Sequence, residues 1–558
     1  MNHDSQKTLH HLLQTGFRQH KAGELAAAER CYRQVLRLQP HQADALYLLG
    51  LLAYQTGQHD RAVSLIEQAL HRAPGSPDAH LHLGMAYRAM HRMDRAEACF
   101  RQALALVPSH SLAWNQMALL HKDRCQQTEA LAAFEHSMAG QPGNVQAFRN
   151  KLLFLQYLPE LDEETRFAEH RRFATTFSGQ VAETVQPFVN TVAPHRPLRV
   201  GYVSSDLCDH VIAFHMLPIL ENHDRRQFEM YAYADVPKPD PITHRMHTLV
   251  TGWRNIAGVE DGQVAKWIRQ DGIDLLIFLA GHFDGNRTLL PIYRAAPIQI
   301  SWHDCATSGF EQMDYILVDR VMVPRHTLER FSERVVCLPT VFAYAPMEDA
   351  PPVSPLPMTQ TEGVMLGCFN NPAKLHAGVL QWWGRLLLRL PNARLLLKYQ
   401  NAYTDPVLRH FVLDHFASLS VPAHRILFEV GHHSRRDHLA HYARVDIALD
   451  PFPYCGATTT FEALWMGVPV IAYPGHNMMS RFSASMLYAL KLDQWVADSE
   501  ETYLAAVEQL ASNPVALADW RKHLRDRVRL APFCDGKRKT RQLERVLRCL
   551  WRVWCKSR

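Results

Sequence analysis

Several absences narrow the classes to which this chain of 558 residues can belong. Its 11 cysteines include no Cys-x-x-Cys pair, and an odd, scattered set argues against a disulfide framework. The apolar runs, such as 275–281 and 464–473, are too short to cross a bilayer. The first ten residues are polar, which argues against a signal peptide, and the net charge of +5 gives no indication of nucleic-acid binding. We therefore expect a cytoplasmic protein with no membrane span and no nucleic-acid partner.

Metal-binding signatures are also missing, although the chain has 33 histidines. The densest histidine cluster contains His432, His433, His438 and His441, and its spacing matches neither His-Glu-x-x-His nor a zinc knuckle. We interpret it as the start of a helix with one functional histidine. No Asp-x-Asp occurs, which argues against a nucleotide-sugar site built on a carboxylate-held metal. We expect no metal and no other cofactor.

A 34-residue period runs through the first quarter of the chain. Small, large apolar and proline residues recur at fixed places in it, for example Ala28, Ala62, Ala96 and Ala130, and Pro40, Pro74, Pro108 and Pro142. This pattern resembles the tetratricopeptide repeat, in which each helix pair buries its apolar face against the next pair. We expect a disordered start (1–8) and four repeats (9–142) that bind peptide segments of other proteins.

From residue 195 the pattern changes to short β-rich runs that alternate with helical stretches, which is typical of parallel βαβ units. The predicted class is therefore α + α/β: a tetratricopeptide helical solenoid followed by two Rossmann-like lobes. The expected segments are a helical cap (143–194), a first lobe (195–345), a proline-rich linker (346–362), a second lobe (363–536) and a basic amphipathic helix (537–558) packed across the lobes. Expected strands are 198–206, 228–234, 273–279, 298–302, 315–318 and 335–338, then 364–369, 394–399, 426–430, 447–449 and 468–473.

The segment 450–469 carries the clearest chemical signal. A strand ends at Leu449, a turn contains Gly456, and Thr458 and Thr459 open a helix. Free backbone N–H groups at a helix start, together with hydroxyl donors, form a binding site for a diphosphate. Glu462, one turn further, is placed to accept from ribose hydroxyls. The alternative is an ordinary helix capped by threonines.

Two histidines and a lysine follow other expected strands. His210 and His282 come just after strands of the first lobe, where an imidazole can act as general base or hydrogen-bond donor. Lys374 follows the first strand of the second lobe and could bind a phosphate. For each histidine the alternative is a packing or capping role, and for Lys374 it is a solvated side chain.

Taken together, these motifs resemble the O-linked N-acetylglucosamine transferase and SPINDLY family. The resemblance rests on Gly-Tyr-Val-Ser-Ser-Asp-x-x-x-His (201–210), Gly-His-x-x-x-Asn-Arg (281–287), Phe-Asn-x-x-x-Lys (369–374), Gly-Ala-Thr-Thr-Thr-x-Glu (456–462) and Arg-x-Arg-Val-x-Leu-Ala-Pro-Phe-Cys-Asp (525–535). They occur in the family's order over nearly the whole chain.

The resemblance implies an inverting, metal-independent glycosyltransferase of the GT-B type, which moves a sugar from a nucleotide diphosphate to Ser or Thr hydroxyls of proteins presented by the repeats. In that scheme Lys374 neutralises the leaving diphosphate, and His210 lies beside the donor and the acceptor hydroxyl; whether His210 is the base stays open. The implied nucleotide-sugar site comprises Asn371, Lys374, His438, Gly456, Thr458, Thr459 and Glu462. His282 and Thr307 are implied to line the donor-sugar or acceptor pocket.

Two departures from the family pattern bear on the donor. Ala457 stands where animal-type enzymes carry histidine, which is closer to the SPINDLY branch, whose plant members use GDP-fucose. Residues 303–306, His-Asp-Cys-Ala, replace the usual Gly-Tyr-Pro stretch in a loop that lines the family's donor-sugar pocket. UDP-N-acetylglucosamine is the default donor, and transfer of fucose from GDP-fucose is the first alternative. The other alternative is a repeat scaffold with little or no turnover.

Overall fold

We describe the fold from a computed structural model of the chain, which covers residues 3–179, 187–283, 285–360, 362–431 and 434–558. The chain divides into two compact units. One unit contains residues 1–151 and 401–411, and the other contains residues 152–400 and 412–558.

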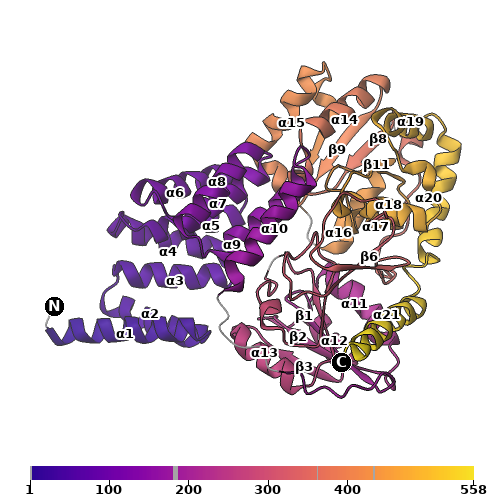
Figure 1. Ribbon diagram of the computed structural model, residues 1–558. Coiled ribbons are helices and arrows are strands. Elements are labelled where there is room, and N and C mark those ends of the chain that lie inside the picture. The colour runs from indigo at the N-terminus through magenta and orange to yellow at the C-terminus, as the bar shows by residue number, and fades with distance from the viewer. Residues whose placement is uncertain (1–2, 180–186, 284, 361, 432–433) are drawn as a thin grey trace. The chain divides into compact units, whose positions relative to one another are not determined.

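The first unit is a stack of antiparallel helix pairs (Figure 1). Each pair corresponds to one 34-residue repeat, and the small residue in each repeat permits a close helix crossing: a Cβ on Gly84 would lie 2.4 Å from Cε1 of Phe100. The pairs are α1 (His3–Lys21) with α2 (Leu25–Leu38), α3 (Ala43–Gln55) with α4 (His59–Arg72), α5 (Pro77–Ala89) with α6 (Met93–Leu106), and α7 (Ser111–Asp123) with α8 (Gln127–Gly140). Helix α9 (Val145–Phe154) follows.

Two expectations for this part of the chain are wrong. The start is not disordered over residues 3–8, because α1 begins at His3 and buries Leu9 against Val35 and Ala45. In addition, residues 401–411, which we assigned to the second lobe, pack with the repeats. Arg124 Nε donates to Asp405 Oδ2 at 2.7 Å, and both side chains are buried.

The second unit contains two parallel sheets. The first sheet has the order β3-β2-β1-β4-β5-β6-β7, and every neighbouring pair is parallel. Its strands are β1 (Leu198–Ser204), β2 (Phe228–Ala234), β3 (Gly252–Asn255), β4 (Leu275–Leu279), β5 (Ile298–Trp302), β6 (Tyr315–Asp319) and β7 (Arg334–Leu338). Helices α11 (Val211–Asn222), α12 (Pro241–Leu249) and α13 (Asp261–Gln270) connect the first four strands. The edge strand β3 was not expected.

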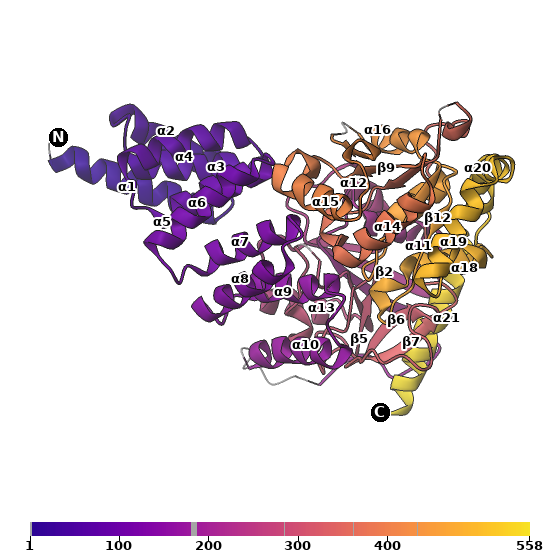
Figure 2. The ribbon, with the colours of Figure 1, turned by 90° about the horizontal axis from the view of Figure 1, so that it is seen from above.

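The second sheet has the order β10-β9-β8-β11-β12 and is also parallel. Its strands are β8 (Met365–Cys368), β9 (Arg394–Lys398), β10 (Ile426–Glu429), β11 (Ile447–Leu449) and β12 (Val470–Ile471). The surrounding helices, visible in Figure 2, are α14 (Ala377–Arg389), α15 (Pro406–Ser418), α16 (Arg435–Ala440), α17 (Thr458–Trp465), α18 (Phe482–Ala489), α19 (Glu500–Ala511) and α20 (Pro514–Arg529). Helix α10 (Glu163–Ser178) precedes both sheets.

Both sheets have a point where the strand order reverses, between β1 and β4 in the first and between β8 and β11 in the second. Open parallel sheets bind ligands beyond the carboxyl ends of their strands at such points. The loops after these four strands carry His210, His282, Lys374 and the segment 450–459, respectively. The topology therefore brings the segments selected from the sequence to the places where a ligand is expected.

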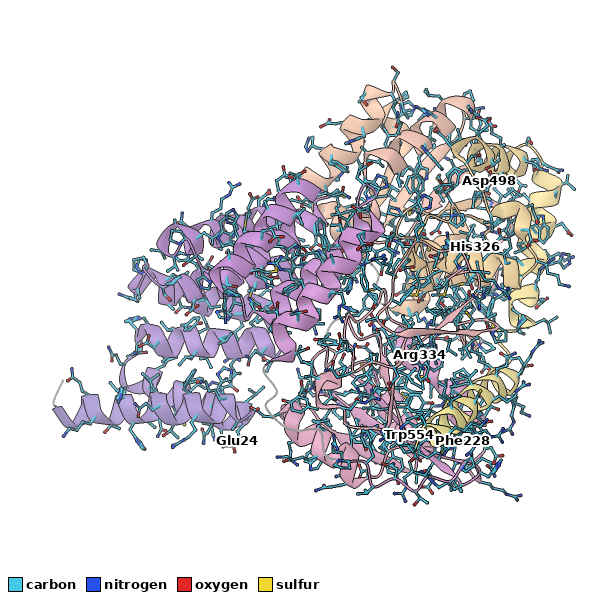
Figure 3. The ribbon with its side chains drawn as sticks, viewed as in Figure 1. Glu24, Phe228, His326, Arg334, Asp498 and Trp554 are labelled. Atoms are coloured by element: carbon cyan, nitrogen blue, oxygen red, sulfur yellow. The ribbon has the colours of Figure 1, made fainter. Side chains whose placement is uncertain are left out.

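The last helix, α21 (Gly536–Lys556), follows the second lobe in sequence but packs against the first, mainly on α11. Arg548 of this helix lies over the ring of Phe228 at the start of β2, 5.3 Å from its centroid. Phe228 and Trp554, the latter from α21, are labelled in Figure 3. The chain passes between the lobes after Tyr344 and again near Phe533. A hydrogen bond joins these two segments, because the Tyr344 N–H donates to the Phe533 carbonyl at 2.8 Å. Among the described residues, no helix is long and apolar enough to cross a membrane.

Candidate functional site

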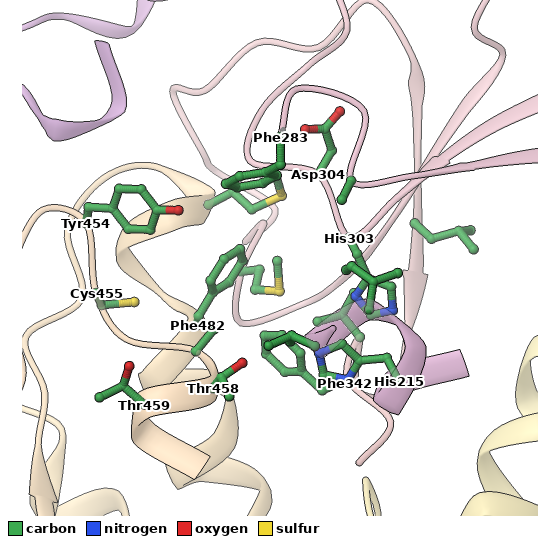
Figure 4. Close-up of a pocket in the computed structure, with 18 of the residues that line it drawn as sticks. His215, Phe283, His303, Asp304, Phe342, Tyr454, Cys455, Thr458, Thr459 and Phe482 are labelled. Carbon is green, nitrogen blue, oxygen red and sulfur yellow. The ribbon is translucent and has the colours of Figure 1, made fainter. Parts of the chain in front are cut away.

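The loops of both lobes enclose a cavity of about 270 Å³. His210 comes to it from the first lobe, and Lys374, Thr458 and Thr459 come to it from the second. Four residues selected from the sequence are therefore brought together, although they are spread over some 250 positions of the chain. In Figure 4, Thr459, Cys455 and Tyr454 lie on one side of the cavity and His215 and His303 on the other, with Thr458 and Phe342 between them.

Lys374 is held at the cavity wall by the second lobe. Its Nζ donates to Asn370 Oδ1 and to the Cys455 carbonyl, both at 2.8 Å, and lies 4.5 Å from the centroid of the Tyr454 ring. Burial lowers the pKa of the Lys374 ammonium, while the nearby Asp450 opposes this shift. Two neutral oxygens and a ring face fix the position of the ammonium without neutralising it. A cation held in this way is suited to the negative charge of a phosphate.

Gly456 lies in a turn with no room for a side chain. Its N–H donates to Asp450 Oδ1 at 2.7 Å, and a Cβ on it would lie 2.5 Å from Thr460 Oγ1. Asp450 is itself fully buried, and its Oδ2 has no hydrogen-bond partner. Burial raises the pKa of the Asp450 carboxyl to about 6. This residue anchors the turn that leads into α17, and the sequence analysis did not select it.

Helix α17 starts at Thr458, directly after the turn. The first N–H groups of a helix have no partner within it, and the helix dipole adds positive potential at this end. No side chain caps this start, since the N-cap residue is Ala457. The alternative of threonines acting as ordinary N-caps is therefore wrong for this helix. Thr458 and Thr459 instead line the cavity next to Lys374.

His210 ends the loop after β1 and caps α11. Its Nδ1 accepts the Ile212 N–H at 3.3 Å, and the side chain is 37% exposed. Since Nδ1 is used as an acceptor, the neutral imidazole carries its proton on Nε2. The carboxylate of Asp206 lies 3.8 Å from Nδ1, beyond hydrogen-bonding distance. Both predicted roles, helix cap and cavity residue, are therefore combined in His210.

A second polar group of the second lobe contains His438 and Glu462. His438 Nε2 lies 3.2 Å from Glu462 Oε2, and its Nδ1 lies 2.9 Å from Lys398 Nζ. Because an ammonium can only donate, His438 accepts at Nδ1 and donates from Nε2 to the carboxylate. The two residues assigned to the nucleotide are thus in direct contact. Lys398, which the sequence analysis missed, is buried beside them.

Six predicted residues lie outside the cavity lining: Gly456, His438 and Glu462, described above, and Asn371, Thr307 and His282. Asn371 caps a short 3₁₀ turn, with its Oδ1 accepting the Ala373 N–H at 3.0 Å. Thr307 donates to Glu333 Oε2 at 2.6 Å within a buried loop network. His282 is also buried, with Nδ1 2.9 Å from the Asp304 carboxylate. Thr307 and His282 therefore lie behind the cavity wall, and their implied role at the donor-sugar or acceptor pocket stays a prediction.

Asp304 is the residue through which His282 reaches the cavity, since Asp304 lines it. Its carboxylate also accepts the Cys305 N–H at 2.8 Å. The ligand atoms of His282, Asp304 and Cys305 lie within 4.8 Å of one another, the spacing of a possible metal site.

Of the histidine cluster near residue 437, His432 and His433 lie outside the described residues, and Ser434 caps α16.

Comparisons with known proteins agree with this geometry. Glycosyl transferase family 41 matches residues 160–347 and 358–543, which is more than half of the chain. Tetratricopeptide repeat families match residues 20–77 and 53–120.

Over 74% of its length, the chain is 32% identical to a protein of Solanum lycopersicum and 34% identical to a protein of Oryza sativa subsp. japonica. Both plant proteins are described as probable UDP-N-acetylglucosamine–peptide N-acetylglucosaminyltransferase SPINDLY. The chain spans 45% of the length of these relatives. Among solved structures, a lysine-to-methionine variant of the Thermobaculum terrenum O-GlcNAc transferase has 29% identity and a TM-score of 0.79, with both chains fully covered.

Proposed function

This chain belongs to glycosyl transferase family 41, and from that premise we propose that it transfers a sugar from a nucleotide diphosphate to Ser or Thr hydroxyls of proteins. The observation that carries the proposal is the shared cavity. It combines a buried ammonium and an uncapped helix start from one lobe with a histidine from the other. UDP-N-acetylglucosamine is the proposed donor.

The reaction requires the acceptor oxygen to attack the anomeric carbon while the bond to the diphosphate breaks. The electron pair of that bond leaves with the diphosphate, whose charge is met by Lys374 and the N–H groups of α17. Attack from the opposite side inverts the anomeric configuration. His210 supplies an Nε2–H to an oxygen of the donor or acceptor, and the proton of the acceptor hydroxyl passes to a phosphate oxygen of the leaving diphosphate.

Titration with nucleotides tests the donor site. A ligand that binds only the folded state of a protein raises the melting temperature of that protein. We expect UDP to stabilise the protein more than GDP, and Lys374→Met to abolish this stabilisation. Lys522→Met, an exposed control in α20, should respond as the wild type does. If neither nucleotide stabilised the wild-type protein, the enzyme proposal would fail and a scaffold role would replace it.

Fucose transfer from GDP-fucose is the second candidate. It is favoured by Ala457 ahead of the two threonines, the feature by which the sequence resembles the SPINDLY branch. Stronger stabilisation by GDP than by UDP, together with fucosylated products in mass spectrometry, would select this candidate.

We further propose that the transfer is independent of metal ions, because Lys374 provides the positive charge for the leaving group. Transfer should then change less than twofold in EDTA. Loss of activity in EDTA that Zn²⁺ or Mn²⁺ restores would contradict this and would direct attention to His282, Asp304 and Cys305.

The repeats are proposed to present the acceptor proteins. A chain without residues 1–142 should lose transfer to protein acceptors while it retains nucleotide binding and slow hydrolysis of the donor. Equal loss of both reactions would instead indicate that the repeats only support the fold.

A further inference from the structure

Behind the cavity wall, a helix and two loops bring together four side chains of the kinds that bind metal ions. His170 lies in α10, His282 follows β4, and Asp304 and Cys305 follow β5. All four residues are buried, with exposed fractions of 5% or less. They are spread over some 135 positions and match no metal-binding motif in the sequence. The transfer reaction proposed above assigns no step to them.

His282, Asp304 and Cys305 have the spacing of a ligand set. Nδ1 of His282 lies 2.9 Å from both carboxylate oxygens of Asp304, and one ligand atom of each of the three residues lies within 4.8 Å of the others. Ligand atoms on one tetrahedral zinc ion lie about 3.2–3.6 Å apart, because the bonds to N and O are about 2.0–2.1 Å long and the bond to S is about 2.3 Å long. Small shifts of the side chains therefore bring the three atoms onto one ion.

His170 supplies a second and independent observation. Its ring is T-shaped to the ring of His282, with centroids 4.8 Å apart. Two imidazoles bound to one tetrahedral zinc ion have ring centres about 5 Å apart. The ring of His170 is fully buried, and neither of its nitrogens has a hydrogen-bond partner among the described residues. Such groups are rare in native proteins, and a metal ion would satisfy this one.

The donor atoms of these four residues suit a zinc ion in charge and in type. One thiolate and one carboxylate neutralise a dication, and two neutral imidazoles complete a set of four ligands. Sulfur and imidazole donors favour Zn²⁺ over Mg²⁺ and Ca²⁺, which prefer oxygen. The same neutralisation removes the cost of an unpaired charge in a buried place.

The surroundings leave room for an ion and a way in. A cavity of about 20 Å³ borders His282 and Asp304, and a space of this size holds one water molecule or ion. Asp304 also lines the larger cavity. In Figure 4 it lies beside Phe283, on the side away from Thr459. An ion can therefore reach the four residues from the larger cavity without passing the diphosphate end.

Two of the four residues come from the stretch in which the sequence departs from the family pattern. Residues 303–306 read His-Asp-Cys-Ala in place of the usual Gly-Tyr-Pro, so that Asp304 and Cys305 are particular to this chain. The combination of donors therefore belongs to this chain and is no general feature of the family.

We propose that His170, His282, Asp304 and Cys305 bind one Zn²⁺ ion. Cys305 binds as the thiolate, and its proton passes to solvent. The Nδ1–H of His282, which donates to Asp304 in the absence of the ion, gives way to the metal, and the ring then carries its proton on Nε2. The ion links α10 to the loops after β4 and β5 and thereby stabilises the wall of the cavity. It takes no part in transfer, since Lys374 meets the charge of the diphosphate.

Metal titration of the full chain tests this site. After treatment with EDTA and dialysis, the protein should take one Zn²⁺ ion per chain from a chromophoric chelator. Co²⁺ in place of Zn²⁺ should give the thiolate-to-cobalt charge-transfer absorption of a tetrahedral site. Zn²⁺ should also raise the melting temperature of the protein, because it binds the folded state, and Mg²⁺ should not.

Three variants locate the ion. Cys305→Ala should weaken Zn²⁺ binding at least about 100-fold and remove the charge-transfer absorption, since loss of a ligand costs more than loss of an outer partner. His170→Phe keeps a ring of similar size without a nitrogen, and it should weaken binding roughly 10- to 100-fold. The matched control is Cys549→Ala, at an exposed position of α21, which should bind Zn²⁺ as the wild type does. Circular dichroism of the metal-free variants shows whether they are folded.

Two results would overturn the site: no tight Zn²⁺ binding by the wild type, or binding that neither Cys305→Ala nor His170→Phe weakens. If Cys305→Ala did not fold, the cobalt spectrum of the wild type would decide, because a missing thiolate absorption excludes Cys305 as a ligand. These measurements need no nucleotide sugar. Their outcome is therefore independent of whether the chain is a transferase.

Discussion

The two lobes present different kinds of polar groups to the same cavity. The second lobe supplies a cation with protein partners, since Lys374 donates to Asn370 and Cys455. The first lobe supplies the stacked rings of His215 and His303, whose pKa values are lowered by burial, and the carboxylate of Asp304, which contacts His282. The difference is that a cation comes from one lobe, whereas imidazoles and a carboxylate come from the other.

The largest effect is expected from removing the charge of the second lobe. Lys374→Met should lower the rate of transfer by roughly 1,000-fold, because the leaving diphosphate loses a preorganised cation in a site with little water. The melting temperature should stay the same or rise, since a buried ammonium is removed. Transfer assays with radiolabelled donor would measure this. Retention of more than a tenth of the activity would show that another group carries the charge.

Substitution of His210, the first-lobe histidine of the cavity, should lower the rate of transfer less than Lys374→Met does. His210→Ala should reduce transfer roughly 100-fold, and His210→Gln, which restores an N–H donor, should recover part of that loss. Rate measurements on both variants distinguish a hydrogen-bond donor from a base. If the Gln and Ala variants were equally slow, His210 would act as the proton acceptor, and the tautomer inferred from its contact with Ile212 would not be the reactive one.

The next prediction concerns Gly456→Ala in the second lobe, a substitution that adds a methyl group and changes no charge. Gly456→Ala places a Cβ 2.5 Å from Thr460 Oγ1 and 3.0 Å from Asp450 Oδ1, so the turn before α17 must shift. We expect a stability loss of about 1–3 kcal/mol, typical of overpacking, together with weaker nucleotide binding. The matched control is Gly143→Ala, where a Cβ would meet nothing within 4 Å. Similar behaviour of the two variants in thermal unfolding and nucleotide titration would contradict the packing argument.

The last effect concerns the pH dependence of stability and leaves the transfer step aside. Burial raises the pKa of Asp450 from 3.8 to about 6, so the fold favours its protonated form. Its contribution to stability is complete below pH 3.8 and is lost as the pH rises through 6, a change of about 3 kcal/mol. Asp450→Asn should remove this loss, because the amide keeps an acceptor for the Gly456 N–H.

Urea unfolding of the full chain between pH 4.5 and 7.5 measures the pH effect. The midpoint should fall with rising pH in the wild type and fall less in Asp450→Asn. Asp519→Asn, at an exposed position, should follow the wild type. Parallel curves for the wild type and Asp450→Asn would show that the protein relaxes around the charge.

Much of the fold follows from local sequence. Strands such as β5 and β11 have the bounds expected from their apolar runs, and the 34-residue period places the helix pairs. The short edge strand β3 was missed because its four residues, Gly252–Asn255, are only partly buried and lack an apolar run. The grouping of residues 401–411 with the repeats depends on the buried pair of Arg124 and Asp405, which are 281 positions apart. No local pattern could reveal that contact.

The sequence predicted the site less completely than the fold, because the roles of several site residues also depend on contacts between distant parts of the chain. Strand ends and a helix start identified His210, Lys374, Thr458 and Thr459, since these positions follow from topology. Of two adjacent asparagines, however, only the fold determines that Asn370 contacts Lys374 while Asn371 caps a turn. The role of a residue such as Asp450 likewise depends on burial and on a neighbouring backbone N–H.

The hydrogen bond between Tyr344 and Phe533 joins the two segments by which the chain passes between the lobes. The lobes are also joined by the Met478 N–H, which donates to Glu329 Oε2 at 2.7 Å, and by Ser485 Oγ, which donates to Asp319 Oδ2 at 2.6 Å. Helix α17 is anchored at Tyr344 through Phe461, whose ring is stacked 3.9 Å from that of Tyr344, and His215 is anchored through Ala343. A shift of residues 343–344 would therefore be transmitted both to α17 and to His215, one element from each lobe.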